Sequence, residues 1–199
     1  MRYSVIAIER EYASGGLEIG EKLAERLGIP CYGQEILERA AVKLRLPPER
    51  LADAEEKITG SLLYSLVAFA SIPADANPEY LSLEQKLALT EANIIKDLAL
   101  SPCVIIGRAA AALLKDKMNT IKVFIHADYG ARMDRAVNVY RLEPRQAESA
   151  LRRFDKRRAA FFRAVTSSEW KDPDLYHITL NSGKLGIYQT ADVLYMAVK

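Results

Sequence analysis

Residues 9–18, with the sequence EREYASGGLE, bring glycines, a serine and charged side chains together in one short connection. An apolar run precedes this stretch, and a segment with helical spacing follows it. Glycines allow a backbone to approach a ligand closely, and the start of a helix presents unpaired N–H groups with a partial positive charge. The stretch therefore predicts a phosphate site formed by the backbone of Ser14, Gly15, Gly16 and Leu17, with Arg10 as the phosphate-binding cation of the loop. A tight strand-to-helix turn without a ligand is the alternative.

The charges around this loop differ from those of an ordinary phosphate site. The common pattern G-x-x-x-x-G-K-[ST] is absent, so the loop supplies neither the lysine nor the hydroxyl of that pattern. Arg10 stands against three carboxylates, those of Glu9, Glu11 and Glu18, and the local balance is acidic. Because a polyphosphate needs cations around its outer phosphates, other segments must contribute them.

Arginines elsewhere in the chain are the candidates for this role. The densest group lies in LRRFDKRRAAFFR at residues 151–163, and Arg108 follows a predicted buried strand. Arg39 lies in a predicted helix after the second strand. A guanidinium suits phosphate because its planar fork donates two parallel hydrogen bonds. A structural ion pair for Arg108 and a purely solvated role for Arg39 remain open.

Strands and helices alternate along the chain and must position these residues. Short β-branched runs predict buried parallel strands, and apolar residues spaced by three and four predict helices. Strands are expected at residues 3–8, 29–33, 103–107, 121–127 and 176–182, and the main helices at 17–28, 34–44, 83–100, 129–141, 143–165 and 186–199. The alternation predicts an α/β fold, a three-layer parallel sheet flanked by helices.

One domain is expected to account for the whole length. A chain of 199 residues can form one α/β domain with a sizeable core. The core is expected from residues 1–44 and 100–199, with a helical insertion at about 45–99 that contains a loop at 71–80.

The overall composition argues against several classes of partner. The net charge of +2 is too small to indicate a nucleic-acid or membrane partner, and no apolar run reaches the about 18 residues that span a bilayer. Cys31 and Cys103 stand far apart among apolar residues and are expected to be free thiols. His126 and His177 have no nearby Cys or His with which to bind a metal. A cytoplasmic protein that binds small molecules is the expectation.

Several segments, in one chain order, resemble a known family. They are EREYASGG after the first strand, CVIIGRAAAALL at 103–114, KVFIHADYGARMDRA at 122–136, DKRRAAFF at 155–162, and a Trp-x-Asp-Pro-Asp-Leu-Tyr run leading into LNSGKLG at 180–186. Through them the sequence resembles the cytidylate kinase-like family, a branch of the P-loop nucleoside monophosphate kinases. The resemblance covers nearly the whole chain and implies ATP and Mg²⁺ as cofactors.

The resemblance also shows where the loop departs from a kinase loop. Laid on an ordinary cytidylate kinase, Gly16 takes the place of the lysine, Glu18 that of the magnesium-binding Ser or Thr, and Arg10 that of the first glycine. Ala13 replaces the middle glycine of the related R-E-Y-G-S-G-G loop. Glu18 has two interpretations, as a carboxylate ligand of Mg²⁺ or as a residue that stabilises the helix N-terminus.

Roles for the distant arginines follow from the same resemblance. In the monophosphate kinases a mobile lid at this point in the chain brings arginines onto the transferring phosphate, which implies a lid at about 143–172 with three catalytic residues, Arg153, Arg157 and Arg158. Arg108 stands where cytidylate kinases have an acceptor-binding arginine, and Arg39 borders the expected acceptor side.

Two functions are compatible with these features. The first is a phosphotransferase that moves phosphate from ATP to a pyrimidine nucleoside monophosphate or a related small acceptor. The second is a regulatory protein that binds a nucleotide or another anion without transfer, and the missing lysine and hydroxyl favour it.

Overall fold

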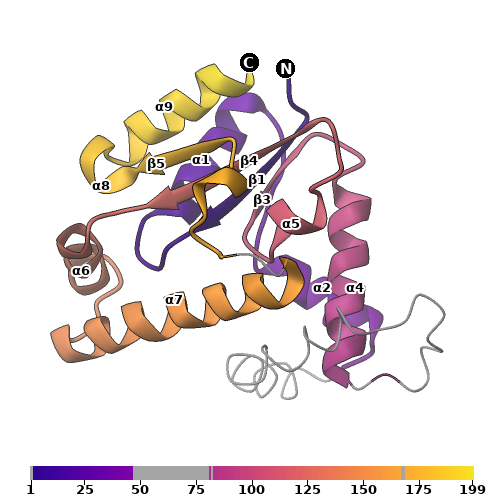
Figure 1. Ribbon diagram of the computed structural model, residues 1–199, viewed down its shortest axis with the longest axis horizontal. Helices are drawn as coiled ribbons and strands as arrows, with labels where there is room; N and C mark the ends of the chain where they lie inside the picture. The colour runs from indigo at the N-terminus through magenta and orange to yellow at the C-terminus, as the bar shows by residue number, and fades with distance from the viewer. Residues whose placement is uncertain (1, 47–80, 82, 167–168) are drawn as a thin grey trace.

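Five parallel strands form one sheet at the centre of the molecule, as the computed structural model in Figure 1 shows. The structure describes residues 2–46, 81, 83–166 and 169–199. The strand order is β2-β3-β1-β4-β5, and every neighbouring pair is parallel. The strands are β1 (Val5–Arg10), β2 (Cys31–Tyr32), β3 (Cys103–Ile106), β4 (Thr120–His126) and β5 (Ile178–Asn181). The predicted α/β class is confirmed.

Helices cover both faces of the sheet and make the three layers that the sequence predicts. They are α1 (Gly16–Leu27), α2 (Glu35–Lys43), α4 (Leu83–Leu98), α5 (Ala110–Leu113), α6 (Tyr129–Asn138), α7 (Pro144–Thr166), α8 (Ser182–Leu185) and α9 (Ile187–Val198). One core lies between the sheet and α1 with α9, and the other lies between the sheet and α2, α4, α5 and the end of α7. Most of the expected insertion, including the loop at 71–80, lies outside the described residues.

The central strand β1 is buried on both faces because its side chains alternate between the two cores. Val5 and Ala7 pack in one core, and Ile6 and Ile8 pack in the other. The strand continues two residues beyond the predicted end at residue 8, through Glu9 and Arg10. Two charged residues are therefore part of the sheet at the point where it meets the loop.

Helix α1 packs closely on the sheet and fixes the far side of that loop. Gly20 faces β3 so closely that an added Cβ would lie 2.2 Å from Cδ1 of Ile106. Gly28 ends the helix in the left-handed conformation, with φ of 66°, as expected for a glycine cap. Leu17, which its spacing assigns to the buried stripe, is instead 50% exposed, and the stripe uses Ile19.

The segment after α7 returns to the sheet through an aromatic cluster. Trp170 is buried, and its ring meets Phe124 of β4 edge to face at 5.3 Å. The hydroxyl of Tyr176 donates to the carbonyl of Trp170 at 2.7 Å. This packing anchors the C-terminal end of α7 to the same sheet that supports the loop.

Two expectations from composition can be compared with the described residues. Cys31 and Cys103 are free thiols, as predicted. Among the residues that the structure describes, none of the helices combines the length and the apolar character needed to cross a bilayer.

Candidate functional site

The candidate phosphate loop is the connection from Glu11 to Gly15 between β1 and α1. Gly15 precedes the first helical residue with φ of 76°, and Ala13 also has a positive φ, of 60°. A left-handed alanine is strained, and such strain is often found at binding sites. The first N–H groups of α1 have no partners within the helix, as at the start of any helix, which is the kind of place where anions bind.

Hydroxyl groups hold this loop in place. The hydroxyl of Ser14 donates to the carbonyl of Glu11 at 2.9 Å. The hydroxyl of Ser182, at the start of α8, lies 2.6 Å from the carbonyl of Ser14 and 2.9 Å from that of His126. The hydroxyl of Ser14 therefore makes a hydrogen bond within the loop. The carbonyl of Ser14 is linked through Ser182 to the ends of β4 and β5.

Both loop glycines are in close contact with neighbouring side chains. An added Cβ at Gly15 would lie 2.3 Å from Cδ1 of Ile187, and one at Gly16 would lie 2.6 Å from Cβ of Arg10. Distances under 3.0 Å require the neighbour to shift. The loop thus has no space for the side chain that an ordinary kinase loop places at position 16.

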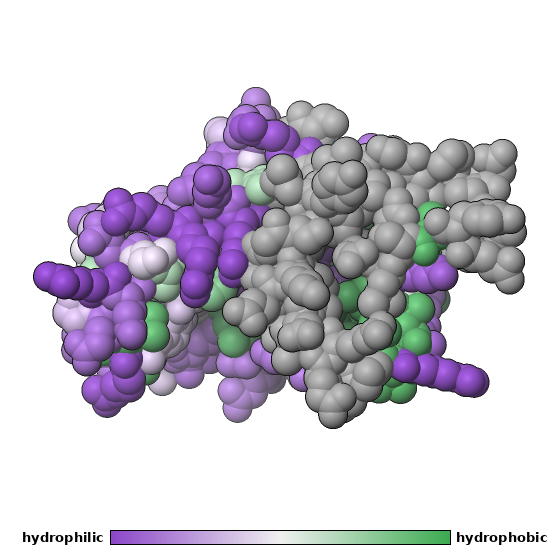
Figure 2. All heavy atoms as spheres, turned by 90° about the horizontal axis from the view of Figure 1, so that it is seen from below, coloured by the Kyte–Doolittle hydropathy of each residue, from purple (hydrophilic) through white to green (hydrophobic). Residues whose placement is uncertain are grey.

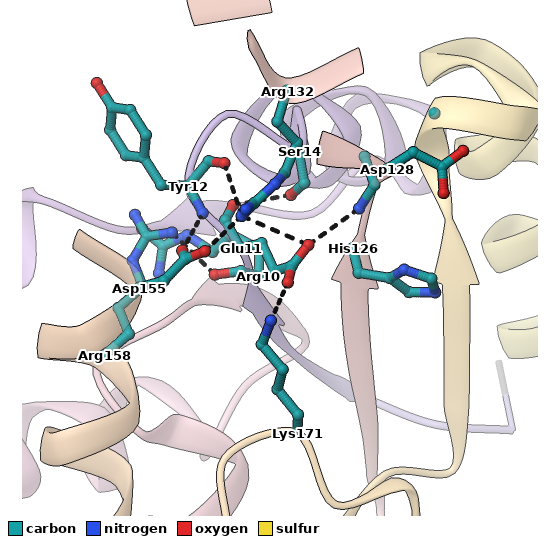
Figure 3. Close-up of polar contacts among 12 residues, drawn as sticks. Arg10, Glu11, Tyr12, Ser14, His126, Asp128, Arg132, Asp155, Arg158 and Lys171 are labelled. Carbon is teal, nitrogen blue, oxygen red and sulfur yellow. Dashed lines mark hydrogen bonds and ion pairs between the residues drawn. The ribbon is translucent and has the colours of Figure 1, made fainter. Parts of the chain in front are cut away.

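A buried carboxylate, that of Glu11, lies between the loop, β4 and the segment after α7 (Figure 3). Lys171 donates to one of its oxygens, and the other accepts from the backbone N–H of Ala127 at 3.2 Å. Arg132 lies 3.5 Å from that second oxygen. The sequence suggested an acidic loop but not this arrangement, because the three partners come from α6, the end of β4 and the chain beyond α7.

Helix α7 is docked on the loop through Asp155. One oxygen of this carboxylate accepts from the backbone N–H of Tyr12 at 2.8 Å, and the other binds Arg132 (Figure 3). Phe154 stacks on the ring of Tyr12, with centroids 4.5 Å apart and an angle of 15°. Phe154 therefore packs against a loop side chain, and Asp155 and Arg132 are site residues that sequence reasoning missed.

Arg158 is the predicted lid arginine that reaches the loop. Its Nη1 donates to the carbonyl of Arg10 at 2.8 Å. Removal from water lowers the pKa of its guanidinium, while Asp155 and Glu9 oppose that change. Arg153 is exposed and lies over the ring of Phe154 at 5.0 Å, and Arg157 lies over the same ring at 5.7 Å.

Arg10 extends from the end of β1 over the end of β3. An added Cβ at Gly107 would lie 1.7 Å from its Nη1, so the guanidinium rests directly on this glycine. The pKa of Arg10 is lowered to about 9, chiefly by burial and also by the charges of Arg158 and Arg108, against the opposing effect of Glu9.

The two predicted acceptor residues differ in their surroundings. Arg108 follows β3 and lies 3.6 Å from the carboxylate of Glu91 in α4, so it makes the ion pair left open by the sequence. It also lies near Arg10, whose pKa it lowers. Arg39 lies over the ring of Tyr32 at 5.2 Å and lines a hollow of about 540 Å³ between α2 and α4. The structure brings Arg108, but not Arg39, to the arginines of the loop.

Glu18 is held by cations. Its carboxylate accepts from Arg135 of α6 at 2.6 Å and lies 3.9 Å from Lys22. Across the described part of the chain, no group of three or more His, Cys, Asp or Glu residues could hold a metal ion. In this conformation the carboxylate of Glu18 is therefore engaged with Arg135, and both interpretations of Glu18 stay predictions.

A parallel sheet with this strand order and a glycine loop after its central strand defines the P-loop kinase-like α/β class. Similar solved structures share the fold. An uncharacterised protein from Eubacterium ventriosum is 24% identical, with 98% of this chain and 97% of that chain covered and a TM-score of 0.72. Shikimate kinase from Bacteroides thetaiotaomicron is 13% identical, with coverage of 98% and 97% and a TM-score of 0.54. Shikimate kinase from Acinetobacter baumannii, in complex with shikimate, is 14% identical, with coverage of 98% and 93% and a TM-score of 0.52.

The chain belongs to the cytidylate kinase-like family, whose model matches residues 5–184. The predicted family is confirmed. A comparison with curated proteins found no significant match.

Proposed function

We propose that this protein transfers phosphate from ATP to a small phosphorylated acceptor, with a pyrimidine nucleoside monophosphate as the first candidate. The observation that supports it is the contact of Arg158 with the carbonyl of Arg10 at 2.8 Å. Through this contact a helix from a distant part of the chain brings a guanidinium to a loop that lacks a lysine. In phosphoryl transfer an arginine supplied in this way increases turnover by about 10³–10⁵.

Each part of the site has a role in this proposal. The N–H groups from Gly15 to Leu17 hold the phosphates of ATP, aided by the partial positive charge of the helix start. The N–H of Ser14, which the sequence included in this set, donates to the carbonyl of Glu11 at 3.3 Å. Arg158 neutralises the charge of the transferring phosphate, with Arg157 and Arg153 nearby on the same helix. Arg108 contacts the acceptor, and Arg39 lies further along the acceptor side.

In this proposal Mg²⁺ does not need a separate site on the protein. Glu18 is paired with Arg135, so its carboxylate is not free to bind an ion. Mg²⁺ commonly binds through substrate phosphates with few protein ligands. The ion would therefore enter with the nucleotide, where it would neutralise the charge of the outer phosphates.

A second candidate function is binding of a nucleotide or another anion without transfer. The cations around the loop are already engaged, since Glu11 holds Lys171 and Asp155 holds Arg132. If these pairs persist when a nucleotide binds, the outer phosphates receive less positive charge than transfer requires. Binding of ATP without turnover would favour this candidate.

Small molecules are the proposed partners, and the cytoplasm is the proposed location. Seen from below, the described residues are mostly hydrophilic, with smaller hydrophobic patches among them (Figure 2). Its exposed cations include Arg152, Arg153 and Lys156. The net charge of +2 remains too small to favour nucleic acid. Free thiols suit a reducing compartment.

The proposed reaction can be tested with Arg158→Ala. Wild-type protein is expected to transfer phosphate from ATP and Mg²⁺ to one member of a panel of monophosphates, with shikimate included as a hydroxyl acceptor. Arg158→Ala is expected to lower kcat by roughly 10³-fold or more. Arg152→Ala is the matched control, because Arg152 lies on the same helix and pairs with Glu148 at an exposed position. Equal activity of the two variants, or no transfer to any acceptor, would contradict the proposal.

A further inference from the structure

The strand β5 forms one edge of the sheet, and α9 runs beside it (Figure 1). Among the residues that the structure describes, β5 pairs with β4 and its other edge pairs with no strand. His177 donates its N–H to Lys122 of β4 at 2.8 Å. Because backbone groups alternate in direction along a strand, the N–H and carbonyl groups of Ile178 and Leu180 point away from β4, toward the open edge.

The usual protections of a sheet edge are missing from β5. Natural edge strands commonly carry charged residues, proline or a bulge, which prevent another strand from pairing. The sequence of β5 is Ile-Thr-Leu-Asn, and its four residues follow β4 in continuous register. Thr179 is exposed on the face that Phe124 also occupies, while Ile178 and Leu180 are partly buried on the face that α9 covers. The edge can therefore accept another strand.

One side of α9 adds apolar residues to this edge. The helix faces α1 through Tyr188, Asp192 and Tyr195, which contact cations of α1. Because α1 packs on β1, β2 and β3, the side of α9 that turns away from α1 lies toward β5. The helical period places Val193 on that side and Met196 between it and the outer surface. These two side chains, the apolar flank of α9, are 42% and 75% exposed.

The charges beyond the two ends of β5 are opposite in sign. The exposed Asp174 precedes the strand, and Lys184, whose side chain is 73% exposed, follows it. Lys184 lies 3.0 Å from Asp128, but an ammonium group has three donors and can bind a second carboxylate. In a two-fold pair of antiparallel strands, the start of one strand lies beside the end of the other. Asp174 of one copy would then face Lys184 of the other, so this edge is complementary to itself.

We propose that β5 pairs antiparallel with β5 of a second copy of this chain, and that the two sheets join into one across a two-fold axis at Thr179. In this register Ile178 of each copy exchanges backbone hydrogen bonds with Leu180 of the other. The two Thr179 side chains meet at the axis, and threonine pairs are favourable between strands. The apolar flanks of α9 approach each other on one face of the joined sheet. The pairing does not depend on the proposed phosphotransferase reaction.

Sedimentation of the full chain tests the pairing. Wild-type protein is expected to show a monomer–dimer equilibrium between about 1 and 500 µM. Thr179→Lys places two like charges at the axis and is expected to raise the dissociation constant of the dimer by about tenfold or more. Thr179→Ser keeps the hydroxyl and should change that constant by less than about threefold. Ser149→Lys is the matched control, because it adds the same charge at an exposed position of α7.

An exchange of charges tests the register. Asp174→Lys alone is expected to raise the dissociation constant by about threefold or more, since it would face Lys184 of the other copy. Lys184→Asp in the same chain should restore most of the affinity, because the two ends are again opposite in charge. A double variant that is as weak as Asp174→Lys would contradict this register.

Amide hydrogen exchange of wild-type protein locates the contact. The N–H groups of Ile178 and Leu180 are expected to exchange about tenfold more slowly at high protein concentration than at low concentration. The N–H of Thr179 points to β4 in both states and is the internal reference. This measurement needs no variant, so it decides the question even if Thr179→Lys folds poorly.

The results separate this pairing from other arrangements. A dimer that is weakened by Thr179→Lys but not by Ser149→Lys, with protection of Ile178 and Leu180 that depends on concentration, supports the proposal. A monomer at every concentration overturns it and leaves a different protein as the partner of this edge. A dimer that Thr179→Lys does not weaken, or that leaves Ile178 and Leu180 unprotected, forms through another surface and also overturns it.

Discussion

At the scale of residues, the loop has a close contact between Gly16 and Arg10 at the position where an ordinary kinase loop has a lysine side chain. Gly16 stands where a kinase loop has its lysine, and the side chain of Arg10 fills the space beside it. The loss of lysine at position 16 and the presence of arginine at position 10 are therefore linked through one steric contact. Guanidinium groups near this loop lie at the ends of strands, with Arg10 at the end of β1 and Arg108 shortly after β3.

This contact makes a prediction for Gly16→Lys. From the family pattern alone, a restored lysine would strengthen binding of a triphosphate. The geometry predicts the opposite, because the new Cβ would lie 2.6 Å from that of Arg10. We expect the free energy of unfolding to fall by about 1–3 kcal/mol in chemical denaturation, without tighter ATP binding. Gly130→Lys is the control, since nothing lies within 4 Å of an added Cβ there. Tighter ATP binding by Gly16→Lys would show that Arg10 moves aside readily.

At the scale of elements, α7 and the loop form one docked unit. Asp155 accepts from the backbone of Tyr12 and binds Arg132 of α6. The aromatic stack between Phe154 and Tyr12 adds contact area beside this carboxylate. The expected lid is thus in contact with the loop in the described conformation.

Removal of the carboxylate is expected to loosen this unit. Asp155→Ala leaves the N–H of Tyr12 and part of Arg132 without an acceptor, which predicts a loss of about 1–3 kcal/mol in the free energy of unfolding. Hydrogen exchange should show less protection at Tyr12 and across α7. Glu148→Ala on the same helix removes only an exposed pair with Arg152 and should change exchange little. Equal protection at Tyr12 in Asp155→Ala and wild type would contradict the docking.

At the scale of the whole molecule, the buried thiol of Cys103 and the partly buried thiol of Cys31 report on the integrity of the two cores. Burial raises the pKa of Cys31 to about 12 and that of Cys103 to about 11. A raised pKa lowers the thiolate fraction, to roughly one in a thousand or less at pH 8. Because the thiolate is the reactive form, both thiols should react slowly with a thiol reagent in buffer and rapidly in denaturant. Rapid reaction of the native protein, compared with Cys31→Ser, would identify a core that opens locally.

The sequence predicts the fold well because the signals of the fold are local. Buried runs such as that of β1, and the spacing that predicts the helix at residues 17–28, depend on neighbouring residues, and both elements are confirmed. The site is harder to predict, because Lys171, Arg132 and Asp155 reach the loop from separate elements. The spacing of these three residues along the sequence does not indicate that they lie together at the loop.

The position of Asp155 three residues before Arg158 has a consequence for how a ligand would be received. Residues at this spacing share one face of a helix, so the carboxylate that fixes the loop and the guanidinium that reaches it arrive together. The entropy of ordering the loop is then lost while the protein folds, and little of it is left to be lost when a ligand binds. A binding site that is ordered before the ligand arrives loses less entropy on binding. This smaller loss would offset the electrostatic contact that the loop lacks because it has no lysine.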